Sequence, residues 1–430
     1  MPVITFPKPL DGGAPPPAPE APGLPTLSVQ IGRSGWLLGV AGSSELGVTT
    51  ILGYATFDDI TSKVRSVNIR RGRQHELNRV EAGTVSVRLL NQDGAFNPTN
   101  TGSQYWPDIR PMVPMKVQAT WSTITYNLFN GFVEAWPATW SGAPVQGDDN
   151  VDMHAVDAFK VLNLAQVTLA RGVETTTDRI NGVLDALGWP STLRSIDVSE
   201  STVQAVASDV NALSHIQEVA ASEGGLFFIA DDGKATFFER LHTTLLDELD
   251  DTWGDAEGEK HYASIATSYD DSNLWNEVIV IAPGLTDQVV EDEASQGLYG
   301  GPATSPRTLS VSTLLTSETE MLDRATFLLG AYSEPHFRIE SMLVENASLN
   351  NDQWERLLLH DLHARVLVRK RPISNVIEQP SFIEGIEWDI SSGRWVLTWR
   401  LSSTALQQGQ WQLGIVGKSE LGVTTSLVSA

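Results

Sequence analysis

The sequence contains no cysteine, which excludes disulfide bonds, thiolate zinc sites and thiol nucleophiles. Stability must therefore come from packing or from assembly. No uncharged apolar run approaches the roughly 18 residues of a membrane-spanning helix, so we expect a soluble protein with no membrane span. The start, MPVITFPKPLDGGAPPPAPEAPGLP, lacks a basic leader and an apolar core, and we interpret it as a proline-rich arm and not as a secretory signal.

Basic residues are scarce. The chain has 29 Lys and Arg against 53 Asp and Glu, a formal net charge of −24, which disfavours a surface that neutralises phosphates. Between Asp231 and Glu293, 17 acidic residues accompany three basic ones, whereas basic residues gather elsewhere, in RSVNIRRGR and RVLVRKR. Two interpretations of this acidic stretch stay open: a solvated, loop-rich face, or an acidic wall that does not hold a passing polyanion.

The apolar pattern predicts a mainly β protein with an α/β insertion. At 430 residues the chain exceeds the roughly 250–300 residues that one core serves, so we expect two or more domains. Period-two alternation predicts strands in KVRSVNIRRG, GTVSVRLLN, MKVQATW, YNLFNGFVEAW, NEVIVIAP, RTLSVSTLL, FRIESMLVEN, HARVLVRKRP, FIEGIEWDIS and RWVLTWRLS. Helical spacing predicts helices in TTTDRINGVLDALGWP, ALSHIQEVAASEGG and ETEMLDRATFLLGAY, and Asp232-Gly233 predicts a hairpin turn.

No motif predicts catalysis or a cofactor. The sequence has no phosphate loop, dinucleotide-binding glycine pattern or G-x-S-x-G elbow. His360 and His363 lack the zincin pattern, and we interpret them as a surface or interface pair. Asp148, Asp149 and Asp152 lack the later glutamate of an EF-hand loop, so they do not predict a calcium site.

Thirteen tryptophans would suit a surface that stacks on sugars. Most of them fall within or next to strand patterns, and we interpret these as core residues. Examples are Trp136, Trp140, Trp388, Trp395 and Trp399. A carbohydrate-binding adhesin of the host surface, and a cell-wall hydrolase with a carboxylate pair, stay open as alternatives to a structural role.

One segment occurs twice. WLLGVAGSSELGVTTIL near the start and WQLGIVGKSELGVTTSL at the end match at 12 of 17 positions. An extended segment of this kind can add to the exposed strand edge of a partner, or it can complete the sheet of its own domain. The candidate assembly residues shared by the copies are Trp36, Glu45, Leu46 and Val48 in the first and Trp411, Glu420, Leu421 and Val423 in the second.

A series of motifs runs in a fixed order between about residues 55 and 402. They are an Arg-Gly-Arg turn at 71–73, an AGT strand start at 82–84, an NxDGxFxP turn at 91–98, a proline-bounded loop and FxGFVExW at 129–136. VDAFKVLN, ASEGGLFFIADDGKATF, EASQGLYG, LLGAYSEPHFRIESMLVEN and GIEWDISSGRWVLTWRLS follow. Together they resemble the tail-tip hub proteins, also called minor tail proteins, of siphophages that infect actinobacteria and similar hosts.

The resemblance implies two hub-type β-barrel domains that pack around a trimer axis, with an insertion domain outside. The implied segments are 1–30, a proline-rich arm; 31–54, the first repeat copy; 55–150, the first β-barrel; 151–250, the α/β insertion; 251–405, the second β-barrel; and 406–430, the second repeat copy. The family is structural, so the resemblance implies no catalytic residue, no cofactor and no metal. Cell-wall degradation and adhesion are expected of partners.

The resemblance also implies the partners and the location. We expect a homotrimer in the tail tip of a virion, made in the host cytoplasm, that contacts a sixfold distal tail ring, the tape measure protein and a central fibre or other tail-tip proteins. DNA would pass through the lumen without specific binding. From the net charge we expect more Asp and Glu than Lys and Arg to line that lumen. Three subunits with two repeat copies each would present six equivalent segments to the ring.

Overall fold

The computed structural model describes residues 23–33, 56–142, 149–240, 242, 251–300, 305–346, 349–372 and 375–404. The matching residues of the two repeat copies, 36–52 and 411–427, lie outside these ranges, whereas residues 31–33 of the first predicted repeat segment are described. The candidate assembly residues Trp36, Glu45, Leu46, Val48, Trp411, Glu420, Leu421 and Val423 therefore lie outside the described residues, and so does Asp148. No helix within the described ranges is long and apolar enough to cross a membrane.

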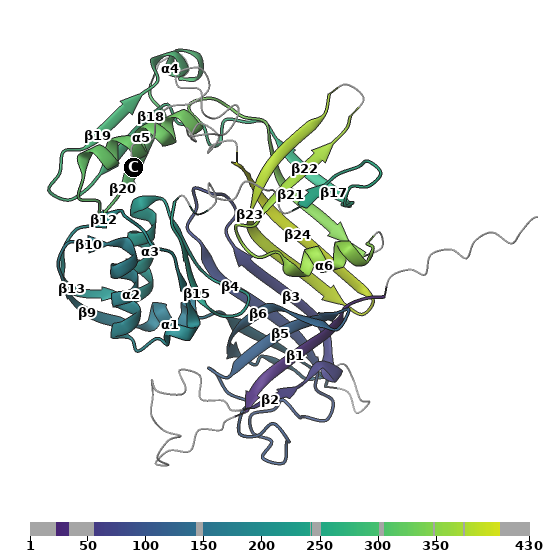
Figure 1. The fold of residues 1–430 in the computed structure, drawn as a ribbon. Coiled ribbons are helices and arrows are strands. Elements are labelled where there is room, and N and C mark those ends of the chain that lie inside the picture. Colours follow the sequence, from purple (N-terminus) through teal and green to yellow (C-terminus); the bar gives the residue numbers. More distant parts are fainter. Residues whose placement is uncertain are drawn as a thin grey trace, which may run out of the picture.

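One large sheet of fourteen strands forms the body of the molecule, and Figure 1 shows it running from the lower centre to the right. Its main path is β17-β21-β24-β23-β3-β4-β8-β6-β5-β1-β2, and β22, β16 and β7 pair beside it. The strands are β1 (Thr26–Arg33), β2 (Thr56–Asp59), β3 (Val64–Gly72), β4 (Glu81–Leu90), β5 (Pro114–Trp121), β6 (Ile124–Ala135), β7 (Ala138–Thr139), β8 (Asn150–Val156), β16 (Asp251–Trp253), β17 (Ser264–Ser268), β21 (Arg338–Glu345), β22 (Arg365–Lys370), β23 (Ile377–Ser391) and β24 (Arg394–Ser403). The path is open between its described ends, so the strands predicted for two barrels share one sheet.

The predicted strand patterns are confirmed, and β4 shows why. Val85, Val87 and Leu89 are buried, whereas the residues between them point outward, as period-two alternation requires. A short 3₁₀ turn, η1 (Thr61–Lys63), leads from β2 into β3.

The insertion lies to the left of the sheet in Figure 1 and packs two helices over small strands. Its elements are α1 (Phe159–Leu164), β9 (Gln166–Arg171), β10 (Glu174–Thr175), α2 (Thr176–Ala186), η2 (Ser191–Leu193), β11 (Arg194–Ile196), β12 (Thr202–Val203), β13 (Val206–Asn211), α3 (Ala212–Glu223), β14 (Leu226–Ile229) and β15 (Ala235–Phe238). The side chains of Thr175 and Asn211 cap α2 and α3, and β14 pairs with β15 across the predicted turn. The two predicted helices and the hairpin are confirmed.

Residues 277–300 and 305–332 form a smaller unit, called here the α5 unit, at the upper left of Figure 1. Its elements are β18 (Glu277–Ile281), β19 (Gln288–Glu291), α4 (Glu293–Tyr299), β20 (Thr308–Ser312) and α5 (Glu318–Tyr332). β18 lies between β19 and β20 in a three-stranded sheet, and α5 covers it with a core of its own. The predicted strands and helix are present, but they do not join the large sheet. The division of the chain into six segments stays a prediction.

The helix α6 (Asn351–Leu359) was not predicted. Its signal is the capping box of Asn350 and Gln353, in which each side chain accepts a hydrogen bond from the other residue's backbone N–H, followed by Trp354 and Leu357 on the buried face. Because the apolar face spans only nine residues, periodicity alone is a weak indicator of this helix.

The tryptophan interpretation is confirmed in most cases. Trp388, Trp395 and Trp399 are buried, and Trp395 packs edge-on against Trp388 at 5.9 Å between ring centroids. The interpretation of Trp140 as a core residue is wrong, since 52% of it is exposed at the end of the short strand β7.

The two halves of the sheet join between β3 and β23, with Gly72 opposite Gly385. Gly72 has a φ of +91°, and a Cβ built on it would lie 2.2 Å from the carbonyl oxygen of Glu384. Only glycine fits there without moving the neighbouring strand.

We predict that Gly72→Ala lowers the free energy of unfolding by about 2 kcal/mol or more, because the new Cβ combines a positive φ with a backbone clash. The control is Gly297→Ala in α4, where a Cβ meets nothing within 4 Å and a gain of about 0.5–1 kcal/mol is expected. Urea denaturation of both variants measures the difference. Equal midpoints would contradict the prediction.

Candidate functional site: the junction turn and its cavity

The last two residues of β3 and the first part of the turn that leads to β4, residues Arg71–Asn78, are together called here the junction turn. It carries the Arg-Gly-Arg motif, and it lies where the large sheet, the insertion and the α5 unit meet.

Arg71 joins three parts of the chain. Its Nη1 and Nη2 donate to the two carboxylate oxygens of Asp361 at 2.7 and 3.2 Å, and Nη2 also donates to the carbonyl of Ile229 at 2.9 Å. Asp361 accepts a further hydrogen bond from the backbone N–H of Asp231, in the β14–β15 turn, at 3.0 Å. Burial and the charge of Asp361 together raise the pKa of Asp231 to about 7. One guanidinium thus holds the insertion against both halves of the sheet.

Arg73 makes a second ion pair across the join. Its Nε donates to Glu384 at 2.6 Å, and the hydroxyl of Ser402 donates to the other carboxylate oxygen at 2.5 Å. Burial alone would raise the pKa of Glu384, but the charge and hydrogen bond of Arg73 outweigh it and hold that pKa below its usual value. Glu384 is therefore a buried carboxylate whose two oxygens are both bonded.

The interpretation of His360 and His363 as a surface or interface pair is wrong for this chain. His360 is buried, and its Nε2 lies 2.7 Å from Oδ2 of Asp251. His363 stacks on Phe382 at 4.4 Å between centroids, and burial lowers its pKa to about 4. The two rings serve different contacts within the fold.

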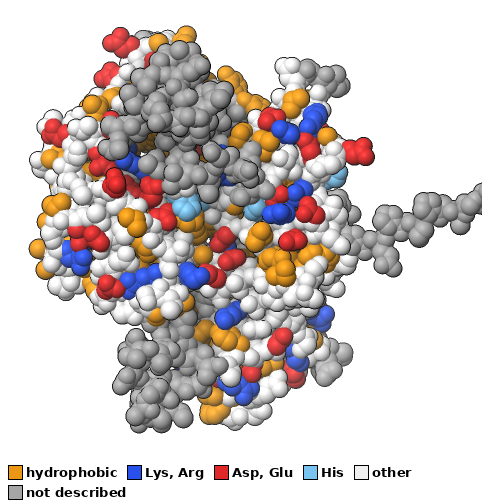
Figure 2. All heavy atoms as spheres, in the orientation of Figure 1, with side chains coloured by type: hydrophobic (Ala, Val, Ile, Leu, Met, Phe, Trp, Pro, Cys, Tyr) orange, Lys and Arg blue, Asp and Glu red, His pale blue; other side chains and the backbone are white. Residues whose placement is uncertain are grey.

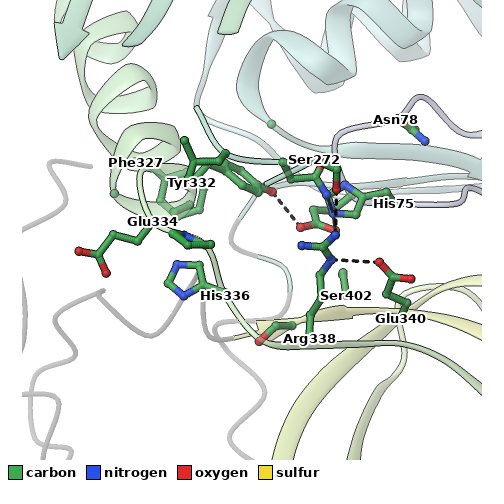
Figure 3. A pocket seen from close by; sticks show the side chains of 18 of the residues that line it. His75, Asn78, Ser272, Phe327, Tyr332, Glu334, His336, Arg338, Glu340 and Ser402 are labelled. Atoms are coloured by element: carbon green, nitrogen blue, oxygen red, sulfur yellow. Dashed lines mark hydrogen bonds and ion pairs between the residues drawn. The ribbon is translucent and has the colours of Figure 1, made fainter. Parts of the chain in front are cut away.

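The second half of the junction turn reaches the α5 unit. Tyr332, at the end of α5 and labelled in Figure 3, donates its hydroxyl to Glu76 at 2.9 Å. Nδ2 of Asn273 lies 2.8 Å from Nε2 of His75, and Leu77 packs against the core of the α5 unit. Burial raises the pKa of Glu76 from 4.5 to about 7 and lowers that of His75 to about 4. Glu76 and His75 are therefore both largely neutral between about pH 4 and 7.

A cavity of about 930 Å³ opens between the junction turn, α5 and the ends of β21 and β24. Figure 3 shows Phe327 on the α5 side and Ser402 on the sheet side. Arg338 borders the cavity and donates to Asp270 at 2.8 Å and to Glu340 at 3.2 Å. The volume falls in the upper part of the range for ligand pockets, about 300–1,000 Å³.

Two other motifs of the series meet in the core under β6. Phe96, of the turn at 91–98, stacks on Trp136, of the segment at 129–136, at 6.1 Å between centroids. The side-chain oxygen of Asn91 accepts the backbone N–H of Phe96 at 2.9 Å, which fixes the turn. These motif residues are therefore used in packing.

The acidic stretch is partly neutralised within the chain. Asp255 pairs with Lys370 at 2.8 Å, Glu259 with Arg371 at 2.6 Å, and Asp271 with Arg307 at 2.6 Å. In the fold, the basic segment RVLVRKR therefore lies beside this acidic stretch. The sequence pattern had placed the two apart because they are far from each other along the chain. Acidic and basic side chains are accordingly intermixed on the described part of the face in Figure 2.

The partners of the motif arginines were not predicted from the sequence. Asp361 lies 290 residues from Arg71, and Glu384 lies 311 residues from Arg73, so no local pattern connects them. Within the described ranges, no group of three or more His, Asp or Glu side chains is placed to hold a metal ion. The arrangement as a whole acts as a joint between structural units.

Comparison with known proteins gives the fold. No family model matches the sequence, and no curated protein matches it. Among solved structures, the chain is similar to a tail protein from Neisseria meningitidis MC58, with a TM-score of 0.57 and 12% identity over 89% of this chain and 98% of that chain. It is also similar to the 43 kDa tail protein of prophage MuSo2 from Shewanella oneidensis, with a TM-score of 0.55 and 10% identity over 88% of this chain and 97% of that chain. The chain therefore has a phage tail protein fold, which confirms the mainly β class with an α/β insertion.

We predict that Asp361→Asn lowers the free energy of unfolding by about 3 kcal/mol, because Arg71 is left buried without its charge partner. The control is Asp58→Asn, which breaks the pair with Arg33, half of whose side chain is exposed, and should cost less than about 1 kcal/mol. Denaturant unfolding monitored by tryptophan fluorescence compares the two. A loss for Asp361→Asn as small as that of the control would refute a central role for this joint.

The raised pKa of Glu76 predicts a pH dependence of stability. Between pH 4.5 and 7 the unfolded chain loses this proton while the folded chain keeps it, so stability falls as the pH rises through this window. The Glu76→Gln variant has no titrating group at this position. Between pH 5 and 7 its free energy of unfolding should therefore fall less than that of the wild type, and the difference should be on the order of 2–3 kcal/mol. Glu355→Gln, at an exposed site on α6, is the control and should keep the wild-type slope. Parallel slopes for all three proteins would contradict the assignment.

Proposed function

We propose that this chain is a structural protein of a phage tail tip: a trimeric baseplate hub that continues the tail tube and adapts a sixfold ring to threefold symmetry. The observation that supports it is the similarity of nearly the whole fold to two tail proteins, which agrees with the order of motifs in the sequence. Siphophages are the proposed source, and the virion tail tip is the proposed location after synthesis in the host cytoplasm.

The roles of the motif residues support a mechanical function. Arg71 and Arg73 bond to buried or half-buried carboxylates, and Phe96 and Trp136 stack on each other. These side chains are engaged inside the chain and hold its units in fixed positions. A hub that transmits force and guides DNA needs this rigidity and no chemical step, so we propose that the chain is not an enzyme.

The two repeat copies are proposed as the docking segments for the sixfold ring. The first copy lies between β1 and β2, whose ends pair at Arg33 and Thr56 on the edge of the large sheet. The second copy follows β24 of the same sheet. Three chains would carry six copies, and each could add an extended segment to a strand edge of the ring through main-chain hydrogen bonds.

The other proposed partners are the tape measure protein, a central fibre or other tail-tip proteins, and DNA that passes without specific binding. A net charge of −24 per chain suits a lumen that repels DNA. Because Asp255, Glu259 and Asp271 are paired with cations, the repulsion would come from other acidic side chains than these three.

Mass measurement tests the trimer. Light scattering on the purified chain at low micromolar concentration should give about 140 kDa, three times the 46.8 kDa of one chain, since permanent interfaces bury on the order of 2,000 Å² or more. If the free chain is monomeric, the assembled tail tip is the deciding sample. One copy per tail tip would refute the hub proposal.

A further inference from the structure

Helix α5 presents one large apolar side chain to the cavity of about 930 Å³. The helix buries Met321, Ala325 and Leu328 against its own sheet, whereas Phe327 lies outside that buried stripe and is 41% exposed. Phe327 faces the cavity, so this side of α5 forms one wall of a groove.

Two further side chains, one on each wall, line the groove. Phe337, just before β21, is 48% exposed and lines the same cavity. Arg324 of α5 borders the cavity too, and it makes no hydrogen bond or ion pair with the described part of the chain. Its Nε is shielded from solvent without an acceptor, and burial, with the nearby charge of Arg240, lowers its pKa to about 10. The groove therefore combines two exposed aromatic rings with a donor, Nε of Arg324, that has no acceptor among the described residues.

The chain itself runs out of this groove. Ser402 and Ser403, at the end of β24, line the cavity, and Thr404 is the last residue described. The 26 residues 405–430 continue from that wall, and Lys418 and Glu420 are the charged residues among them. So few charges, together with apolar residues such as Trp411, are not the composition of a solvated tail.

The reach of this segment is sufficient. An extended chain spans about 3.3 Å per residue, so the residues from Thr404 to Trp411 cover roughly 23 Å. The 15 residues of α5 are about 22 Å long at 1.5 Å per residue. The segment up to Trp411 is thus about as long as the α5 wall itself.

We propose that the C-terminal segment, residues 405–430, binds in this groove of its own chain. Its apolar side chains fill the space between Phe327 and Phe337, and one of its oxygen atoms accepts the hydrogen bond that Arg324 has to offer. This inference rests on the groove and not on the proposed role in a phage tail. A ring that binds the second repeat copy would compete with the groove for it.

Hydrogen–deuterium exchange on the full chain tests the proposal, with a synthetic peptide of residues 405–430 as the free reference. The groove variant is Phe327→Asp, and the matched control is Leu298→Asp in α4, where the leucine is 75% exposed and outside the cavity lining. Amides of β18 report in each variant whether the α5 unit stays folded. Phe337→Asp, on the opposite wall, serves as a second groove variant if Phe327→Asp unfolds that unit.

We expect amides around Trp411 to exchange at least about tenfold more slowly in the full chain than in the peptide, which is what burial of one large apolar side chain supplies. A groove variant should remove this protection, and Leu298→Asp should retain it. Peptide-like exchange in the wild-type chain overturns the proposal, and so does protection that survives both groove variants. Protection that grows with protein concentration assigns the groove to the segment of a second copy and overturns binding within one chain.

Discussion

The ion pair between Arg71 and Asp361 is the contact on which the arrangement of the units depends. It connects β3 of the first half to a loop of the second half, and the same two side chains bond to the backbone of the β14–β15 hairpin. Only 5% of the Arg71 side chain is exposed, and Asp361 is its direct charge partner there. Removal of either partner would therefore affect the sheet and the insertion together.

The sequence predicts local elements well and long-range partners poorly. Alternation identified β4 and the other long strands because each buries one face, and helical spacing of apolar residues identified α2 and α3. The Arg-Gly-Arg motif could also be recognised in the sequence, but it contains only the arginines of the two ion pairs and not their acidic partners. Asp361 and Glu384, which complete it, are single acidic residues among the 53 of the chain, and only the fold brings them to the turn.

The pattern of charges along the sequence led to a wrong expectation for the same reason. The excess of acidic residues between 231 and 293 is real in the sequence, but Asp255 and Glu259 lie beside Lys370 and Arg371, more than a hundred residues away along the chain. His360 and His363 are close in sequence, yet one contacts Asp251 and the other Phe382. Sequence distance is a poor measure of electrostatic distance where strands from both ends of a chain share one sheet.

The shared sheet also bears on how this chain folds. The pairing of β3 with β23 closes a loop of roughly 300 residues that contains the insertion and the α5 unit. Closing so long a loop costs chain entropy before its contacts form, so this pairing is expected to form late, after the local hairpins and helices. Gly72 and the two arginines beside it lie at that closing point, where β3 meets β23 within a few ångströms of Glu384. The insertion and the α5 unit, which lie between the two strands in the sequence, are therefore expected to fold before the sheet closes.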